Sequence, residues 1–228
     1  MKKSLLIILL AMTLSSCFTT TYMVDGNYKL KDANANYGVG LINDGAYFDE
    51  YVTLMPSVTD SKIDLVIINQ HTSSIRVLWD NAAFIDGSGF AQRVIHTGVK
   101  LIDKDKAQVP SVIPAGSRIT DVVVPVDGIE FTNGDWTYLP FIKRSFNDLE
   151  SAENLLSLYN TTPAHSQITL LLPIEVDDRK IEYTMIFEGE KFQITSSETV
   201  DQAASMKAVY GWSIGASILT ILLTLVAI

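Results

Sequence analysis

The pattern of apolar and polar residues divides the chain into three parts. Uncharged, largely apolar runs occupy residues 4–14 and 208–228, and shorter apolar stretches alternate with polar ones between them. Ile181, Tyr183 and Met185 are separated by Glu182 and Thr184, which is the period of a strand with one buried face. The stretches rich in Val, Ile, Tyr and Phe predict eight strands: Tyr51–Met55, Lys62–Asn69, Ile75–Trp79, Gln92–His96, Arg118–Val126, Trp136–Ile142, Gln167–Val176 and Lys180–Thr195.

Turn residues separate these strands. Asp86-Gly87-Ser88-Gly89, Asn133-Gly134-Asp135 and Asp177-Asp178 are the clearest turns, and the last of them predicts a hairpin between residues 170–176 and 180–187. One helix is expected over 148–160, capped by Asn147 or Asp148. The pattern of these central segments therefore predicts a mainly β fold, an antiparallel β-sandwich with one inserted helix.

The first seventeen residues have the organisation of an export signal. Lys2 and Lys3 precede the apolar run, and Leu14-Ser15-Ser16-Cys17 follows it. This tetrapeptide resembles the lipobox of bacterial lipoproteins, and the resemblance implies that residues 1–16 are removed and Cys17 is lipidated. The alternative is an ordinary signal peptide with a chance cysteine.

The last apolar run is long enough to cross a bilayer. Residues 208–228 carry no charge, and 21 helical residues span about 30 Å. The sequence thus predicts a C-terminal transmembrane helix, with a buried core helix or a removed sorting tail as alternatives. Gly211 and Gly215 have the spacing at which two such helices approach closely, so self-association is a further expectation.

These segments give five expected regions. They are a signal peptide at 1–16, a lipidated cysteine and flexible tether at 17–46, the β-sandwich at 47–195, a linker at 196–207 and the membrane helix at 208–228. Both ends would hold the body on the exported, periplasmic side of one membrane. A helical anchor favours the inner membrane of a bacterial envelope over the outer one.

Composition narrows the choice of partners. The chain has 17 Lys and Arg against 26 Asp and Glu, a formal charge of −9, although its mean hydropathy is +0.22. Nucleic acid is not expected as a partner, because phosphate binding needs clustered basic residues. A single cysteine excludes a disulfide framework within the chain.

Part of the body resembles a known class of domain. Residues 64–72, 75–79, 84–89 and 113–117 run strand, Asn-x-x-Thr turn, strand, Asp-x-x-Gly turn and Pro-x-Gly-Ser turn. That order is similar to Ig-like domains of bacterial envelopes. The resemblance implies an Ig-like sandwich that binds partners or acts as a spacer, with the helix at 148–160 as a departure from it.

No catalytic set stands out in the sequence. His71, His96 and His165 are isolated, with His96 the best candidate for a polar contact inside the fold. Asp103-Lys104-Asp105-Lys106 and Asp177-Asp178 could offer oxygen ligands to calcium, but they also suit solvated turns. No metal, no cofactor and no enzymatic activity are therefore expected.

An aromatic segment is the best candidate for an interaction surface. It combines Trp136, Tyr138 and Phe141 with Lys143 and Arg144, although a core strand would have the same pattern. We expect a membrane-anchored envelope lipoprotein that serves as a protein-interaction or structural accessory subunit. A small-ligand or lipid-binding protein is the alternative, and an envelope hydrolase ranks below both.

Overall fold

A computed structural model of the chain describes residues 18–38, 40–142 and 144–200. Within them the fold is mainly antiparallel β with one α-helix, α2 (Leu149–Thr161). The strands are β1 (Phe18–Ala35), β2 (Leu41–Asn43), β3 (Ala46–Phe48), β4 (Val52–Val58), β5 (Ile63–Asn69), β6 (Ile75–Val77), β7 (Ala83–Ile85), β8 (Ala91–Ile95), β9 (Ser111–Ile113), β10 (Arg118–Pro125), β11 (Ile129–Thr132), β12 (Asp135–Tyr138), β13 (Arg144–Phe146), β14 (Gln167–Val176) and β15 (Arg179–Val200).

Two layers of strands share the main core. The first has the order β13-β1-β15-β14-β7-β8, and the second has the order β10-β5-β4-β3-β2. Alternate residues of β5, such as Ile63, Leu65 and Ile67, are fully buried, and they join Leu170 and Leu172 of β14 in one cluster. The hydrophobic periodicity of β5 thus turns one face inward, where burial stabilises the body.

A short contact joins the two layers at one edge. Val124 and Pro125 of β10 pair with Ile95 and Val94 of β8, so that thirteen of the described strands form one hydrogen-bonded sheet. This differs from the Ig arrangement, in which two sheets stay separate.

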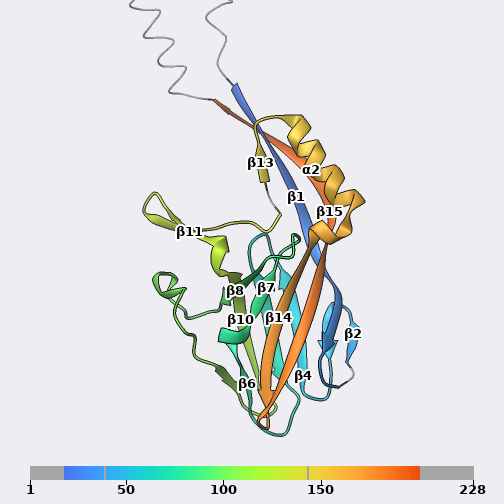
Figure 1. Cartoon of the computed structure of the whole chain (residues 1–228), viewed down its shortest axis with the longest axis vertical. Helices are drawn as coiled ribbons and strands as arrows, with labels where there is room; N and C mark the ends of the chain where they lie inside the picture. Colours follow the sequence, from blue (N-terminus) through green and yellow to red (C-terminus); the bar gives the residue numbers. More distant parts are fainter. Residues whose placement is uncertain (1–17, 39, 143, 201–228) are drawn as a thin grey trace, which may run out of the picture.

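The longest ladder joins the first and last described strands. β1 pairs with β15 from Phe18 opposite Val200 to Ala35 opposite Tyr183. Beyond Gln167, which lies opposite Glu188, β14 no longer accompanies β15. The segments 18–25 and 193–200 therefore leave the body as a two-stranded ribbon, with β13 and α2 beside it (Figure 1).

The helix forms where the sequence predicts it. Asp148 caps it by accepting a hydrogen bond from the Ser151 amide at 2.7 Å. Ala152 and Tyr159 turn inward, and Tyr159 packs on Phe192 of β15 with ring centroids 4.9 Å apart. These contacts fasten α2 to the ribbon.

The structure corrects the expected fold class. The expected fold class included a transmembrane helix, whereas among residues 18–38, 40–142 and 144–200 no helix is both long enough and apolar enough to cross a membrane. Residues 208–228, including Gly211 and Gly215, lie outside the described residues, as does Cys17. The flexible tether at 17–46 is also wrong from Phe18 onwards, because β1, β2 and β3 occupy most of it.

Candidate interaction surface and pocket

A separate hairpin projects from the body. β11 and β12 pair only with each other, from Ile129 opposite Tyr138 to Thr132 opposite Asp135. Asn133 and Gly134 connect them with φ values of 55° and 86°, the backbone of a type I′ turn. Figure 1 shows this hairpin as an arm on the left, away from α2 and the ribbon.

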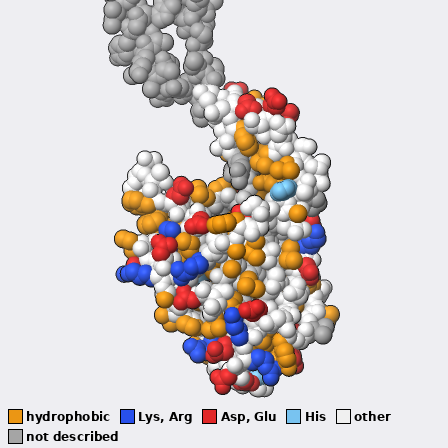
Figure 2. All heavy atoms as spheres, viewed as in Figure 1, with side chains coloured by type: hydrophobic (Ala, Val, Ile, Leu, Met, Phe, Trp, Pro, Cys, Tyr) orange, Lys and Arg blue, Asp and Glu red, His pale blue; other side chains and the backbone are white. Residues whose placement is uncertain are grey.

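The hairpin carries aromatic side chains, of which Phe131 is strongly exposed to solvent. Phe131 and Trp136 lie opposite each other with ring centroids 5.0 Å apart, and Phe131 is 60% exposed. Ile129 at the root of the arm joins a small buried cluster with Val126, and the half-buried Trp136 packs against that cluster. In the space-filling view, apolar side chains follow the arm, and the surface is hollowed between the arm and the ribbon (Figure 2).

The structure separates the five residues predicted as an interaction surface. Trp136 and Tyr138 lie on the arm. Phe141 instead packs inside, on Phe84 at 5.0 Å. Lys143 lies outside the described residues, and Arg144 begins β13, with no side chain described. Sequence reasoning missed Phe131, although its place two residues before Asn133-Gly134 in a hairpin puts it opposite Trp136.

A pocket of about 240 Å³ lies beneath the arm. Its polar walls come from Lys62, His96, Thr97 and Tyr138, which belong to segments far apart in sequence. The ammonium of Lys62 lies 4.2 Å from the centre of the Tyr138 ring, close enough for a cation–π contact. The apolar walls are Ile95, Val99, Leu101, Val122 and Val124.

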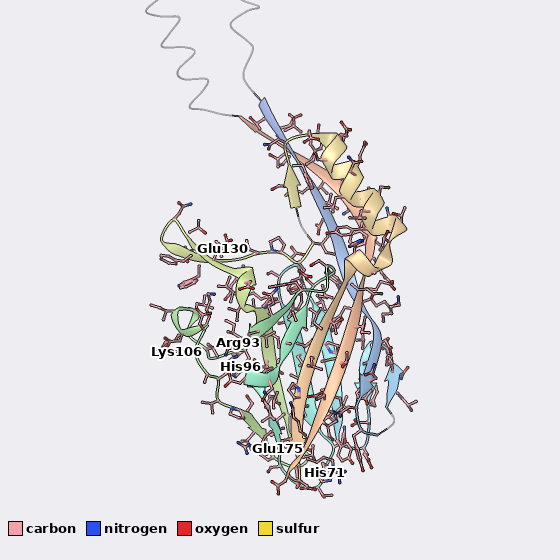
Figure 3. All side chains as sticks on the ribbon, in the orientation of Figure 1. His71, Arg93, His96, Lys106, Glu130 and Glu175 are labelled. Carbon is pink, nitrogen blue, oxygen red and sulfur yellow. The ribbon has the colours of Figure 1, made fainter. Side chains whose placement is uncertain are left out.

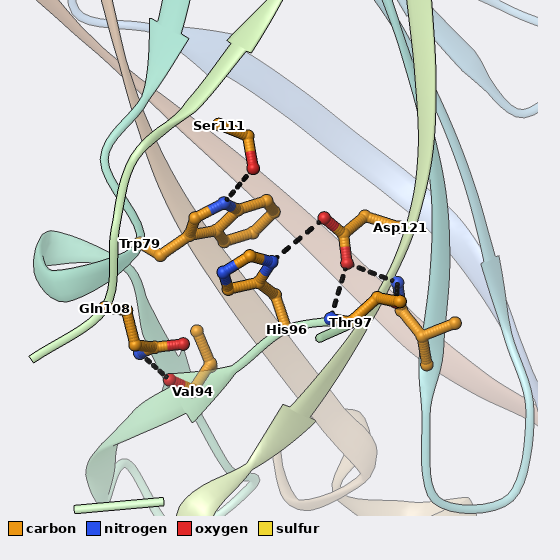
Figure 4. A network of polar contacts seen from close by, with 8 residues as sticks. Trp79, Val94, His96, Thr97, Gln108, Ser111 and Asp121 are labelled. Carbon is orange, nitrogen blue, oxygen red and sulfur yellow. Dashed lines mark hydrogen bonds and ion pairs between the residues drawn. The ribbon is translucent and has the colours of Figure 1, made fainter. Parts of the chain in front are cut away.

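His96 is held by two partners behind the pocket. Its ring stacks on Trp79, with centroids 4.4 Å apart and planes 9° apart, and its Nδ1 lies 3.1 Å from Asp121 Oδ2. The Trp79 indole donates to Ser111 Oγ at 2.8 Å. Figure 4 shows this chain of contacts, which confirms His96 as a polar contact within the fold.

The Asp121 carboxylate is saturated with donors. Besides His96, Oδ1 accepts the amides of Thr97 at 2.7 Å and Val122 at 2.8 Å. Burial alone would raise the pKa of Asp121, but the hydrogen bonds from His96 and Thr97 outweigh it, so the pKa lies below its ordinary value. The acid is therefore ionised at neutral pH and fixes the loop that follows β8.

The loop between β8 and β9 is tied to the same side. Arg93 reaches Asp80 at 3.0 Å and also donates to the carbonyls of Asp105 and Lys106. Lys106 forms an ion pair with Asp103 at 2.8 Å, so these two charges within the loop neutralise each other. Figure 3 places Arg93 and Lys106 on the same side of the body as His96, with Glu130 on the arm above them, whereas Glu175 and His71 lie at the opposite end of the body from the ribbon.

His71 and His165 do not line this pocket. His71 contacts Ser73, whose hydroxyl donates to Asp177 at 2.6 Å. The other nitrogen of the His71 ring, Nε2, lies 3.6 Å from Asp177 Oδ2. In a Ser-His-Asp triad the serine hydroxyl is hydrogen-bonded to the imidazole, whereas the Ser73 hydroxyl donates to the carboxylate itself. His165 lies in a 3-10 turn (Pro163–Ser166), where its carbonyl contacts Gly87.

Metal ligands do not gather in the described structure. No group of three or more His, Cys, Asp or Glu side chains that could hold an ion occurs in residues 18–38, 40–142 and 144–200. Comparison with known proteins finds no matching family model, curated protein or solved structure. Function is therefore inferred from the geometry of the chain itself.

Proposed function

We propose that this chain is a bacterial envelope lipoprotein that holds a protein-interaction body on the exported side of a membrane. Acylation of Cys17 anchors it, and the exposed β11–β12 arm contacts a protein partner. The observation that carries the proposal is this arm, an otherwise unpaired hairpin that ends in exposed aromatic side chains.

The energetics of a lone hairpin support a partner. Two strands without a third strand or a covering helix are marginally stable in water, and exposed aromatic groups are typical of protein interfaces. The arm leaves Phe131 60% exposed, although the Trp136 ring beside it is half-buried against the body. A partner that covers Phe131 and Trp136 would bury this surface and stabilise the arm.

The ribbon supports the anchoring role. β1 begins at Phe18, directly after the proposed lipid site, and pairs with β15 from its first residue. The eight residues 18–25 cover about 26 Å as a strand. Paired strands resist bending more than a Gly-rich tether, so the ribbon would hold the body at a fixed distance from the lipid.

Photo-crosslinking in intact cells tests the interaction. A photoreactive amino acid at Phe131 should capture a protein partner, because that side chain is exposed on the arm. Leu41 is 72% exposed on the edge strand β2 and provides the matched control. Equal capture at both positions, or none at Phe131, would count against the arm as an interface.

A second experiment tests the anchor separately. Replacing Cys17 with alanine should abolish fatty-acid labelling, because the thioether would have no sulfur to form on. The body should still fold, because the buried residues of its clusters lie at Val24 and beyond. Labelling that persists in Cys17→Ala would rule out the lipobox interpretation and leave the arm proposal standing.

A further inference from the structure

We propose that the pocket beneath the arm binds a small aliphatic carboxylate. This site is distinct from the exposed face of Phe131, and it does not depend on the membrane anchor. The pocket combines one uncompensated cation with apolar walls, which is the complement of an anionic group on a short hydrocarbon chain.

Lys62 supplies the positive charge. No acid among the described residues lies within ion-pair distance of its ammonium, which instead rests over the Tyr138 ring at 4.2 Å. Two other cations on the same flank are already paired, Arg93 with Asp80 and Lys106 with Asp103. Lys62 is thus a half-buried cation fixed in the wall of a cavity.

The nearest buried acid does not oppose an anion at Lys62. Asp121 is not among the residues that line the pocket, and its oxygens already accept from His96, Thr97 and Val122. The backbone amide of Gly98, which does line the pocket, donates to no described residue. It is available as a second donor to the anion.

The apolar walls define the rest of the ligand. Val99, Leu101 and Val124 line the cavity, and its volume of about 240 Å³ is below that of a site for a drug-sized molecule. One cation without an arginine fork suits a singly charged carboxylate better than a phosphate. These features favour a carboxylate on a hydrocarbon chain of a few carbons.

The test uses the full chain in detergent with pentanoate as the probe. Pentanamide has the same hydrocarbon chain without the charge. We expect pentanoate to bind at least about tenfold more tightly than pentanamide, measured by ligand-observed NMR titration. Equal binding of the two, or no binding of pentanoate, would overturn the proposal.

Two variants locate the binding. Lys62→Met should weaken pentanoate binding about tenfold, because the chain length is kept and the charge is removed. Lys100→Met is the matched control, since Lys100 is an exposed lysine next to the pocket loop and outside its lining. If Lys100→Met weakens pentanoate binding as much as Lys62→Met does, the effect is general charge attraction and not a specific site.

A filling substitution provides an independent check that leaves Lys62 unchanged. Val99→Trp places a larger side chain in the cavity from a half-buried loop position, so it should abolish pentanoate binding. Circular dichroism should show an unchanged fold for both Val99→Trp and Lys62→Met. If folded Val99→Trp binds pentanoate as the parent does, the ligand is not in this pocket.

Discussion

The Asp121 carboxylate links strand β10 by hydrogen bonds to the His96 ring and to the loop that follows β8. It lies on β10, yet it accepts from the His96 ring and from the Thr97 amide after β8. Only 5% of the residue is exposed. Removing its charge leaves buried donors without a full acceptor, and each such loss costs about 1–3 kcal/mol.

Asp121→Asn should therefore lower the free energy of unfolding by about 1–3 kcal/mol at pH 7, measured by urea denaturation. The parent protein should also lose stability in acid. Because the folded pKa is lowered, this contribution is complete above the ordinary carboxyl pKa of 3.8 and is lost as the pH falls below it.

The matched control for Asp121 is Asp105→Asn. Its carboxylate is 79% exposed and has only a 3.7 Å contact with Lys104. Its stability should match the parent at pH 7. If Asp121→Asn loses as much stability as the parent when the pH falls below 3.8, another group governs the acid transition.

Asn69 is a second residue on which local structure depends. Its side-chain amide donates to the carbonyls of Ser73 at 2.8 Å and Ile113 at 2.9 Å, and its oxygen accepts the His71 amide. Asn69→Ala should lower the free energy of unfolding by about 2 kcal/mol or more, because three backbone groups lose their partner. Chemical denaturation measures this, with the exposed neighbour variant Thr72→Ala as a control expected to be neutral.

For single residues, the sequence predicted which side chains make internal contacts but not which side chains they contact. His96 was a good candidate for an internal polar contact because its neighbours Val94 and Ile95 read as a buried strand. Its partner Asp121 lies 25 residues further along the chain. Lys62 precedes β5, and it contacts Tyr138 of the separate β11–β12 hairpin. Only the pairing of strands brings such residues together, so the pocket could not be derived from spacing.

Among the elements, strands with regular alternation were predicted well. The hairpin of β14 and β15 forms around Asp177-Asp178, as expected, and β5, β10 and α2 lie within one or two residues of their predicted bounds. β1 was missed. Its ladder with β15 shifts register between Asp25 and Asn27 and again between Leu30 and Asp32. The second shift adds a residue to β1, so its inward positions change from even numbers, such as Leu30, to odd ones, such as Ala33.

Gly26, next to one of these bulges, controls the contact between the ribbon and α2. A Cβ at this position would lie 2.5 Å from the Phe192 ring, which packs on Tyr159 of the helix. Gly26→Val should displace the ring and speed amide hydrogen exchange in α2 by roughly tenfold, while β5 keeps its protection.

Thr21→Val is the control for the ribbon. It exchanges one β-branched side chain for another of the same shape on the same strand, opposite Ser197 and not opposite Phe192. Its hydrogen exchange in α2 should remain that of the parent. If Gly26→Val leaves α2 unchanged as well, Tyr159 and Phe192 do not hold the helix to the ribbon.

For the whole molecule, the ladder of β1 and β15 sets the orientation. Phe18 and Val200 lie side by side at one end, and Asp177 and Asp178 turn the chain at the other (Figure 1). The 22 residues of β15 correspond to about 70 Å of strand between these ends. A lipid on Cys17 would therefore place the His71–Asp177 end far from the membrane.

Site-directed dye labelling measures this orientation. Cys17 is the single cysteine of the chain, so acylation leaves no competing thiol and each introduced cysteine is labelled alone. In proteoliposomes with a quencher on the lipid headgroups, a dye at Ser197→Cys on the ribbon should be strongly quenched. A dye at Asp178→Cys should be almost unaffected, because both positions are exposed but only the first adjoins the anchored end.

Iodide in the aqueous phase should quench both dyes and so confirm their exposure. Equal quenching by the headgroup probe would mean that the body lies flat on the bilayer, and the ribbon would then not act as a stalk.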